Sequence, residues 1–244
     1  VNIGCDEAFM VGLGKFLQKH GYQNRFEIVN RHIAKVLEIA GKYGFRCSMW
    51  SDMYFRLAFN GVYRCSEPRE FPAEIAALAP KNVTLVYWDY DYTGVEHYRN
   101  MFASHKKFAN DVAFAGGAWK WRGFAPANRF SMKCADAAVR AARENGIKTM
   151  TVTAWGDNGG EASLFSVMPS LYYFARLCKG QSVAPEELER GFKKLTGAGF
   201  SDFLDIEEID NFPWNNAERN PPASKNFLYN DCFLGIQDSL IEGG

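Results

Sequence analysis

The chain has 244 residues, and its 28 lysines and arginines are balanced by 28 aspartates and glutamates. Hydrophobic residues make up 47% of the sequence and aromatic residues 15%, which suffices for a sizeable core and excludes a disordered chain. No run of 18 apolar residues is present, and the zero net charge gives no general footprint for nucleic acid or an anionic membrane. We therefore expect a globular protein with neither nucleic acid nor membrane among its partners.

Six cysteines occur, and no two of them form a CxxC motif. This spacing favours free thiols in a reducing compartment, so we expect a cytoplasmic protein. A secretion signal on a longer precursor remains compatible with the sequence.

Five short apolar runs alternate with helical patterns along the chain. The runs cover 1–4, 45–50, 82–88, 112–119 and 149–155, and helical patterns follow them at 26–43, 73–78, 95–108, 131–145 and 162–178. Continuously apolar strands that alternate with helices indicate an α/β fold with a parallel sheet buried on both faces. A doubly wound sheet and a (β/α)8 barrel both have this pattern, but neither GxGxxG nor GxxxxGK[ST] follows a strand, which disfavours nucleotide binding.

Acidic or aromatic residues stand at the end of every predicted strand, and five of the six tryptophans lie there. In chain order the residues are Asp6 and Glu7, Trp50 and Asp52, Tyr87, Trp88 and Asp89, Trp119 and Trp121, and Trp155 and Asp157. In a barrel the carboxyl ends of different strands converge on one mouth, where the active site is built. The pattern therefore favours a (β/α)8 TIM barrel.

Tryptophans and carboxylates in one mouth suit a carbohydrate, because sugar rings present apolar C–H faces to indoles and hydroxyls to carboxylates. Cleavage of a glycosidic bond also needs a carboxylic acid that protonates the leaving oxygen. A single tryptophan at a strand end is more often a core residue, and a single aspartate there is often a helix cap. Their repetition at five strand ends favours carbohydrate chemistry.

The histidines give no support for a metal-dependent enzyme. His20, His32, His97 and His105 fall in helical segments or at their ends, without the spacing of zinc ligands, and we expect them on helix surfaces. The sequence also lacks a GxSxG nucleophile motif. We expect neither a metal nor another cofactor.

The strand-end motifs resemble, in chain order, those of glycoside hydrolase family 20, the β-N-acetylhexosaminidases. The run 2–7, NIGCDE, resembles the family's H-x-G-G-D-E, with Asn2 and Cys5 in place of the histidine and the second glycine. The runs 50–52, 87–89 and 155–157 are similar to its W-x-[DE], Y-x-D and closing W-x-[DE], and Trp119 or Trp121 corresponds to its seventh-strand tryptophan. The detailed sequence looks more like the bacterial exo-N-acetylglucosaminidase branch of the family than like the animal lysosomal enzymes. The runs that carry this likeness are GCDEAF, MWSDM, AWGDNGGE and LYND.

The resemblance implies an exo-acting retaining glycosidase that removes terminal β-linked N-acetylglucosamine or N-acetylgalactosamine from a glycan or glycoconjugate. Adjacent residues on a strand point to opposite faces, so Asp6 and Glu7 would not straddle a glycosidic bond as acid and nucleophile. The family instead uses substrate assistance, in which the 2-acetamido oxygen attacks the anomeric carbon and forms an oxazolinium ion.

By the same resemblance, Glu7 is the general acid and then the base, and Asp6 orients the acetamido group. Tyr87 hydrogen-bonds the acetamido oxygen, with Tyr90 as the alternative. The remaining implied sugar-binding residues are Trp50, Asp52, Asp89, Trp119, Trp121, Trp155 and Asp157. A non-catalytic sugar-binding barrel and a two-carboxylate retaining glycosidase are the other functions open to the sequence.

The family's D-E pair ends the fourth strand, so residues 1–180 would hold strands 4 to 8 and residues 181–244 a helical extension that packs on the barrel. The first strands would be supplied by another chain or by a clipped segment, because five strands of an eight-stranded barrel leave exposed edges. In the extension, 201–212 is acidic and amphipathic, and we expect a solvated face there rather than a docking surface.

Overall fold

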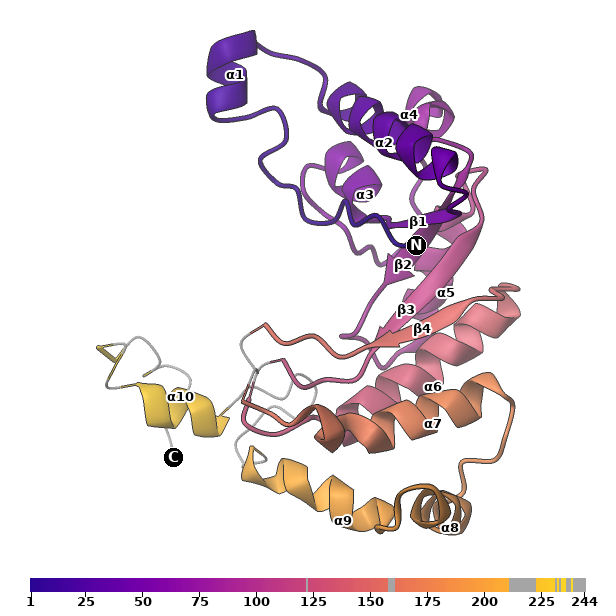
Figure 1. Ribbon diagram of the computed structural model, residues 1–244, viewed down its shortest axis with the longest axis vertical. Coiled ribbons are helices and arrows are strands. Elements are labelled where there is room, and N and C mark those ends of the chain that lie inside the picture. Colours follow the sequence, from indigo (N-terminus) through magenta and orange to yellow (C-terminus); the bar gives the residue numbers. More distant parts are fainter. Residues whose placement is uncertain are drawn as a thin grey trace. The chain divides into compact units, whose positions relative to one another are not determined.

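The computed structural model describes residues 1–121, 123–157, 161–210, 223–230, 232, 234, 235 and 238 (Figure 1). The chain divides into two compact units. Unit 1 consists of Val1–Trp88, Gly94–Ala115 and Arg140–Thr151, and unit 2 consists of Asp89–Thr93, Gly116–Val139 and Val152–Gly244. Because the chain passes between the units several times, neither unit is one continuous stretch of sequence.

The described strands form one parallel sheet in the order of the sequence. The strands are β1 (Cys47–Trp50), β2 (Val83–Trp88), β3 (Val112–Gly117) and β4 (Met150–Thr153), with neighbours in the order β1-β2-β3-β4. β1 pairs with β2 and β2 with β3 in parallel. Backbone bonds from Phe114 N–H to the Thr149 carbonyl and from Ala118 N–H to the Thr153 carbonyl advance in the same direction along β3 and β4.

The first predicted strand is reduced to a single bridge. Asn2 pairs in parallel with Ser48, and the N–H of Ile3 donates to the Ser48 carbonyl at 2.8 Å. The Trp50 N–H donates to the Gly4 carbonyl at 3.1 Å. Val1–Gly4 therefore runs beside β1, at the place where the first of the five strands was predicted.

Helices follow the strands as the alternation predicted. In unit 1 they are α1 (Lys15–His20), α2 (Arg25–Lys42), α3 (Asp52–Ala58), α4 (Ala73–Leu78) and α5 (Val95–His105), and α6 (Asn128–Glu144) begins in unit 2 and ends in unit 1. Unit 2 also contains the 3-10 turns η1 (Leu164–Val167) and η2 (Asp205–Ile209) and the helices α7 (Met168–Cys178), α8 (Pro185–Thr196), α9 (Phe200–Leu204) and α10 (Ala223–Tyr229). No helix in the described part of the chain is long and apolar enough to cross a bilayer.

Alternation along β2 gives the sheet of unit 1 two different faces. Val86 clusters with Ala113 and Ala115, and the half-buried rings of Trp50 and Trp88 pack against this cluster. The neighbouring side chains Leu85 and Tyr87 are fully buried, and the Tyr87 ring contacts α5. Side chains of successive strand residues point to opposite faces, so Trp88 and Tyr87 lie on different sides of the sheet.

In unit 2, α7, α8 and α9 share an apolar core. Leu188, Phe192 and Phe200 form its buried centre, with Tyr172 and other residues of α7 packed against them. Gly197 ends α8 in the left-handed conformation, at φ 84°, which suits a residue without a side chain. The helices α8 and α9 therefore pack directly on α7.

The expectation of a solvated acidic face at 201–212 is wrong for two of its residues. Glu207 and Asp210 are only 3% and 2% exposed. Glu207 lies in η2 and Asp210 directly follows it, and they accept hydrogen bonds from the backbone N–H groups of Arg129 and Ala125, far back in the sequence. Buried carboxylates need such partners, so this side of the segment is a docking surface within unit 2.

The architecture is thus an α/β fold with a parallel sheet whose strand order follows the sequence. A doubly wound sheet reverses its strand order at a switch point, and the described sheet contains no such reversal. The order is compatible with part of a barrel.

Candidate functional site

The predicted catalytic pair lies on a tight turn directly after the Val1–Gly4 bridge to β1. Gly4, Cys5 and Glu7 have φ values of 74°, 74° and 48°. The left-handed region costs a residue with a side chain about 1–2 kcal/mol, so Cys5 and Glu7 are strained. Surrounding contacts must stabilise this turn.

Asp52, at the start of α3, provides the main contact that stabilises the turn. Its Oδ2 accepts hydrogen bonds from the Glu7 N–H at 3.0 Å and from Arg56 Nε at 2.8 Å, and its Oδ1 accepts from Trp88 Nε1 at 3.3 Å. Asp52 is fully buried. The structure therefore places Asp52 beneath the turn as a positioning residue for Glu7, rather than in reach of a ligand.

The carboxylates of Asp6 and Glu7 are exposed above this support. The Glu7 side chain is 52% exposed, and its Oε1 lies 3.4 Å from Nη2 of Arg56. The Arg56 guanidinium also lies 4.9 Å from the centre of the Phe9 ring. We call Asp6, Glu7, Asp52 and Arg56 the carboxylate cluster; all four belong to unit 1.

Cys5 directly precedes Asp6 in the turn, and its thiol is half-buried. Burial raises the pKa of the Cys5 thiol, and the negative charges of Asp6 and Asp52 raise it further. The thiol therefore stays protonated near neutral pH and adds no charge to the turn.

A buried polar pair under the second strand end was not anticipated from the sequence. Ser51 Oγ lies 2.8 Å from Nε2 of His105, whose Nδ1 lies 2.7 Å from the Met101 carbonyl. Both side chains are fully buried, so the expectation of a surface position is wrong for His105. The pair anchors the strand end between Trp50 and Asp52 to α5. Helical periodicity could have found it, because His105 continues the buried face of Tyr98, Met101 and Phe102.

Tyr87 does not lie on the face of the sheet that carries Trp50 and Trp88. Its ring is fully buried and contacts Phe102, His105 and Phe114, at centroid distances of 5.1, 4.8 and 5.4 Å. A phenol in this position packs the sheet against α5 and is shielded from solvent. The alternative that the sequence left open, Tyr90, has different surroundings.

Tyr90 is the centre of an aromatic cluster in unit 2. Its hydroxyl accepts a hydrogen bond from Nε1 of Trp155 at 3.0 Å, and its carbonyl accepts one from Nε1 of Trp119 at 2.7 Å. Its ring contacts Trp121 edge-on at 5.2 Å, and Trp119 and Trp121 lie 4.6 Å apart. We call Tyr90, Trp119, Trp121 and Trp155 the aromatic cluster. Trp155 is 38% exposed, whereas the other three rings are buried.

Gly117, at the end of β3, leaves the space that this cluster fills. A Cβ at Gly117 would lie 2.7 Å from the Trp121 ring and 2.8 Å from the Tyr90 ring. Ser131 of α6 then fixes the first tryptophan, because its Oγ accepts the Trp119 N–H at 2.9 Å. The helix predicted at 131–145 begins three residues earlier, at Asn128, so Ser131 lies inside α6 and its hydroxyl bonds the loop.

The two remaining predicted aspartates lie at opposite extremes of exposure. Asp89 is 1% exposed and its Oδ1 accepts the Asp91 N–H at 3.3 Å, whereas Asp157 is exposed. Asp89 therefore shapes the loop that carries Tyr90. The exposed carboxylate of Asp157 can be reached from solvent. Among the described residues, no group of three or more histidines, cysteines, aspartates and glutamates is arranged to hold a metal ion.

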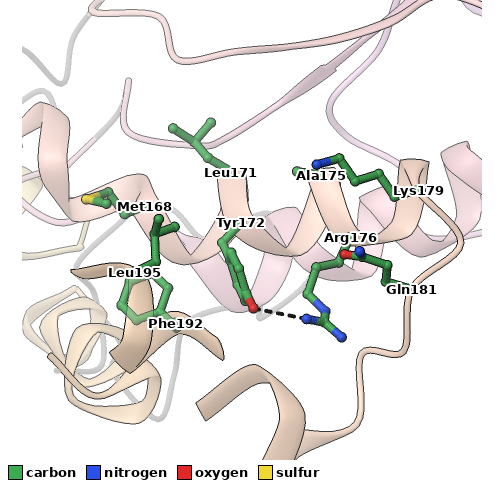
Figure 2. A pocket seen from close by; sticks show the side chains of 9 residues that line it. All are labelled: Met168, Leu171, Tyr172, Ala175, Arg176, Lys179, Gln181, Phe192 and Leu195. Atoms are coloured by element: carbon green, nitrogen blue, oxygen red, sulfur yellow. Dashed lines mark hydrogen bonds between the residues drawn. The ribbon is translucent and has the colours of Figure 1, made fainter. Parts of the chain in front are cut away.

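Unit 2 has a groove whose lining residues are drawn in Figure 2. It has a volume of about 350 Å³ and is lined by α7, α8 and the segment between them. Tyr172 and Arg176 line it and are joined by a hydrogen bond of 3.0 Å. None of the predicted site residues contributes to its lining.

Comparison of the chain with models of known protein families and with curated proteins gives no match. The candidate site is therefore defined by its geometry and by the strand-end motifs. That geometry brings some of the predicted residues together: Asp6 and Glu7 are exposed above the buried Asp52, and Trp119, Trp121 and Trp155 bond or contact Tyr90. Trp50, Tyr87, Asp89 and Asp157 belong to neither cluster.

Proposed function

We propose that this protein is a β-N-acetylhexosaminidase of the glycoside hydrolase family 20 type, which removes terminal N-acetylated sugars by substrate assistance. The observation that carries the proposal is the turn at residues 4–7. A strained backbone, held by a buried carboxylate, presents two adjacent carboxylates to solvent. Strain of this kind accumulates at functional sites, where the surrounding structure enforces it.

In this proposal the carboxylate cluster performs the proton transfers. Glu7 protonates the leaving oxygen and afterwards removes a proton from the attacking water, while Asp6 orients the acetamido N–H of the substrate. The substrate's acetamido oxygen forms the bond to the anomeric carbon that an enzymic nucleophile would otherwise form. Asp52 acts through Glu7, because it bonds the backbone of Glu7 and is itself buried.

The aromatic cluster is proposed to contact the sugar through Trp155, its exposed member. Tyr90 takes the acetamido role first assigned to Tyr87, because Tyr87 is buried against α5. Trp119 and Trp121 support Tyr90, and the exposed Asp157 is proposed to bind a sugar hydroxyl. In unit 1, the half-buried Trp50 is the indole available for stacking.

We also propose that the sheet is part of a (β/α)8 barrel completed by strands from another polypeptide or a clipped segment. The supporting observation is that Val1–Gly4 and β4 are the two edges of the described sheet. Each of them bonds to a strand on its inner side, and no further described strand continues the sheet on its outer side. Parallel strands normally have neighbours on both sides or are covered. Mass spectrometry of the native sample tests this: an additional polypeptide in the complex is expected, and a homogeneous 27.5 kDa species would contradict it.

The function is tested with a chromogenic N-acetyl-β-glucosaminide and three forms of the protein. We expect hydrolysis by the unsubstituted protein, loss of hydrolysis with retained binding in Glu7→Gln, and loss specific to acetamido substrates in Asp6→Asn. Glu38→Gln is the matched control, since Glu38 is exposed and pairs only along its helix with Lys42.

Other outcomes point to the competing functions. Binding of N-acetylglucosamine without hydrolysis by the unsubstituted protein would indicate a sugar-binding barrel. An unchanged rate in Asp6→Asn would exclude substrate assistance and favour a glycosidase with two catalytic carboxylates. Absence of both binding and hydrolysis in the complete native complex would overturn the proposal.

A further inference from the structure

The acidic segment of α9 and η2 reaches back to the loop that carries Trp119 and Trp121. Oδ2 of Asp210 accepts the N–H of Ala125 at 2.8 Å. A side chain at Gly123 would collide with the Asp210 carboxylate, so the glycine allows the loop to approach this closely. Asp210 is 2% exposed and therefore bonds this loop in surroundings that exclude most water.

Glu207, one turn earlier, bonds the residues at which the same loop enters α6. Its Oε2 accepts a hydrogen bond from the Arg129 backbone N–H at 3.1 Å, and its Oε1 accepts one from Nη1 of the Arg129 side chain at 2.7 Å. Burial raises the pKa of the Glu207 carboxyl, and the bonds from Arg129 oppose that rise. The Ala127 N–H donates to the Trp119 carbonyl at 2.8 Å, so the backbone held by Glu207 is bonded in turn to the tryptophan.

The helix α10 extends the same network to the loop after β4. The Ser224 hydroxyl donates to Oδ1 of Asp210, and Nζ of Lys225 lies 2.8 Å from the Glu161 carboxylate. Glu161 follows Trp155 by six residues in the sequence. The Lys225 ammonium also lies 5.9 Å from the ring of Phe124, which belongs to the Trp119–Trp121 loop.

These contacts connect two loops that the sheet alone does not join. The loop after β3 contains Trp119 and Trp121, and the loop after β4 contains Trp155. The first loop is bonded to Asp210 and the second to Lys225, and every residue involved belongs to unit 2. Buried, charge-assisted bonds to backbone N–H groups are among the stronger positioning interactions in proteins.

We propose that Glu207, Asp210, Ser224 and Lys225 form a clasp that fixes the two tryptophan loops, and that sugar binding by the aromatic cluster depends on it. The four are positioning residues, because these bonds end on backbone N–H groups, on the Arg129 guanidinium, on Glu161 and on one another rather than on the tryptophan rings. The sugar-binding part of this inference rests on the proposed function. The positioning of the loops by the clasp does not.

Hydrogen exchange tests the positioning, and sugar binding tests its consequence. In Asp210→Ala we expect the amides of 118–127 to lose protection by at least about tenfold, because the carboxylate that holds the Ala125 N–H is removed. We expect the dissociation constant for N-acetylglucosamine, followed by tryptophan fluorescence, to rise at least about tenfold. The Michaelis constant should rise by a larger factor than the turnover number falls. A general loss of folded protein would instead lower the apparent turnover number and leave the Michaelis constant unchanged.

Matched variants keep the test decisive if Asp210→Ala folds poorly. Ser224→Ala and Lys225→Met each remove one peripheral bond and should give smaller changes of the same kind. Glu189→Gln is the control, because Glu189 also accepts a backbone N–H, that of Ser201 in α9, and the bonds described for it lead to Ser201 rather than to a tryptophan loop.

The outcomes separate the clasp from the proposed function. Unchanged exchange in Asp210→Ala and Ser224→Ala would overturn the clasp. Faster exchange with unchanged sugar affinity would show that binding does not depend on it and would overturn the second half of the inference. If the unsubstituted protein binds no sugar, the proposed function fails, and the exchange result still decides whether the clasp holds the loops.

Discussion

The carboxylate cluster and the aromatic cluster both stand at strand ends, yet they are built in opposite ways. In the first, exposed carboxylates are presented on a strained backbone and a buried aspartate supports them from beneath. In the second, three of four rings are buried and one is exposed. Residues that perform chemistry are often held in conformations that lower stability, whereas a platform for a ligand gains its rigidity from packing. Substitutions of the exposed Asp6 and Glu7 should therefore separate activity from stability, whereas substitutions of the buried Asp52 and of the aromatic cluster should affect both.

The largest effect is expected at Glu7. Replacing the acid by glutamine should lower turnover of substrates with poor leaving groups by about 10²- to 10⁴-fold, because proton transfer to the leaving oxygen is lost. Stability should hardly change, since the side chain is half exposed and its pairing with Arg56 is at the surface. Steady-state kinetics and denaturant unfolding of the same samples measure both.

The variant Glu7→Gly sharpens this separation of activity from stability. Glycine adopts φ 48° without strain, so the free energy of unfolding should rise by about 0.5–1 kcal/mol, after allowance for the greater freedom of glycine in the unfolded chain. Activity should be lost as in Glu7→Gln. A fall in stability would show that the turn is not strained at this residue.

Substitution of Asp52 should lower both activity and stability. Asp52→Ala removes the acceptor for the Glu7 N–H and leaves Arg56 without its buried partner, at a cost of about 3 kcal/mol. Activity should fall as well, because Glu7 loses its support. Urea unfolding and kinetics test this, with the exposed Asp111→Ala as the control. Full activity in a destabilised Asp52→Ala would contradict the positioning role.

In the aromatic cluster, Gly117→Ala should destabilise the protein by about 1–3 kcal/mol, because the new Cβ would overlap the rings of Trp121 and Tyr90. The tryptophan emission should shift as these rings move. Gly41→Ala is the matched control: its Cβ would meet open space in the last turn of α2, so that variant should be stabilised by about 0.4–1 kcal/mol. Equal responses at the two glycines would contradict the tight packing of the cluster.

The smallest effect is expected at a surface ion pair outside both clusters. Hydrogen bonds from Arg99 lower the pKa of Glu144 to about 2, below its value of 4.5 in an unfolded chain. A lowered pKa in the folded state contributes stability above about pH 4.5, and that contribution is lost as the pH falls toward 2. Glu144→Gln should therefore be slightly less stable than the unsubstituted protein at pH 6, and the difference should shrink as the pH falls toward 2. A difference in thermal midpoint that stays the same between pH 6 and pH 2 would show that the pair acts by packing.

Much of the fold could be predicted because local patterns and tertiary packing agree. The apolar strands 82–88 and 112–119 contain β2 and β3, and the helix predicted at 26–43 matches α2, which is capped by Asn24. The helix predicted at 162–178 divides into η1 and α7, with Pro169 near the start of the helical part.

The predictions that were wrong concern polar residues whose partners are distant in sequence. His105 was expected at the surface but bonds Ser51 in the core, and Glu207 was expected in solvent but bonds Arg129. A polar side chain on an apolar helix face has the same local pattern whether its partner is water or a residue far along the chain. Burial and pairing become visible only when the elements are packed.

The sequence alone determined the alternation of strands and helices and the gathering of acidic and aromatic residues at the strand ends, because periodicity and breaking residues are local properties. The tertiary structure decided which of these residues face solvent. It buried Tyr87 against α5, made Tyr90 the centre of the tryptophans, and placed Asp52 under Glu7. Those assignments depend on the face of each strand and on contacts between residues tens of positions apart, which no local pattern specifies.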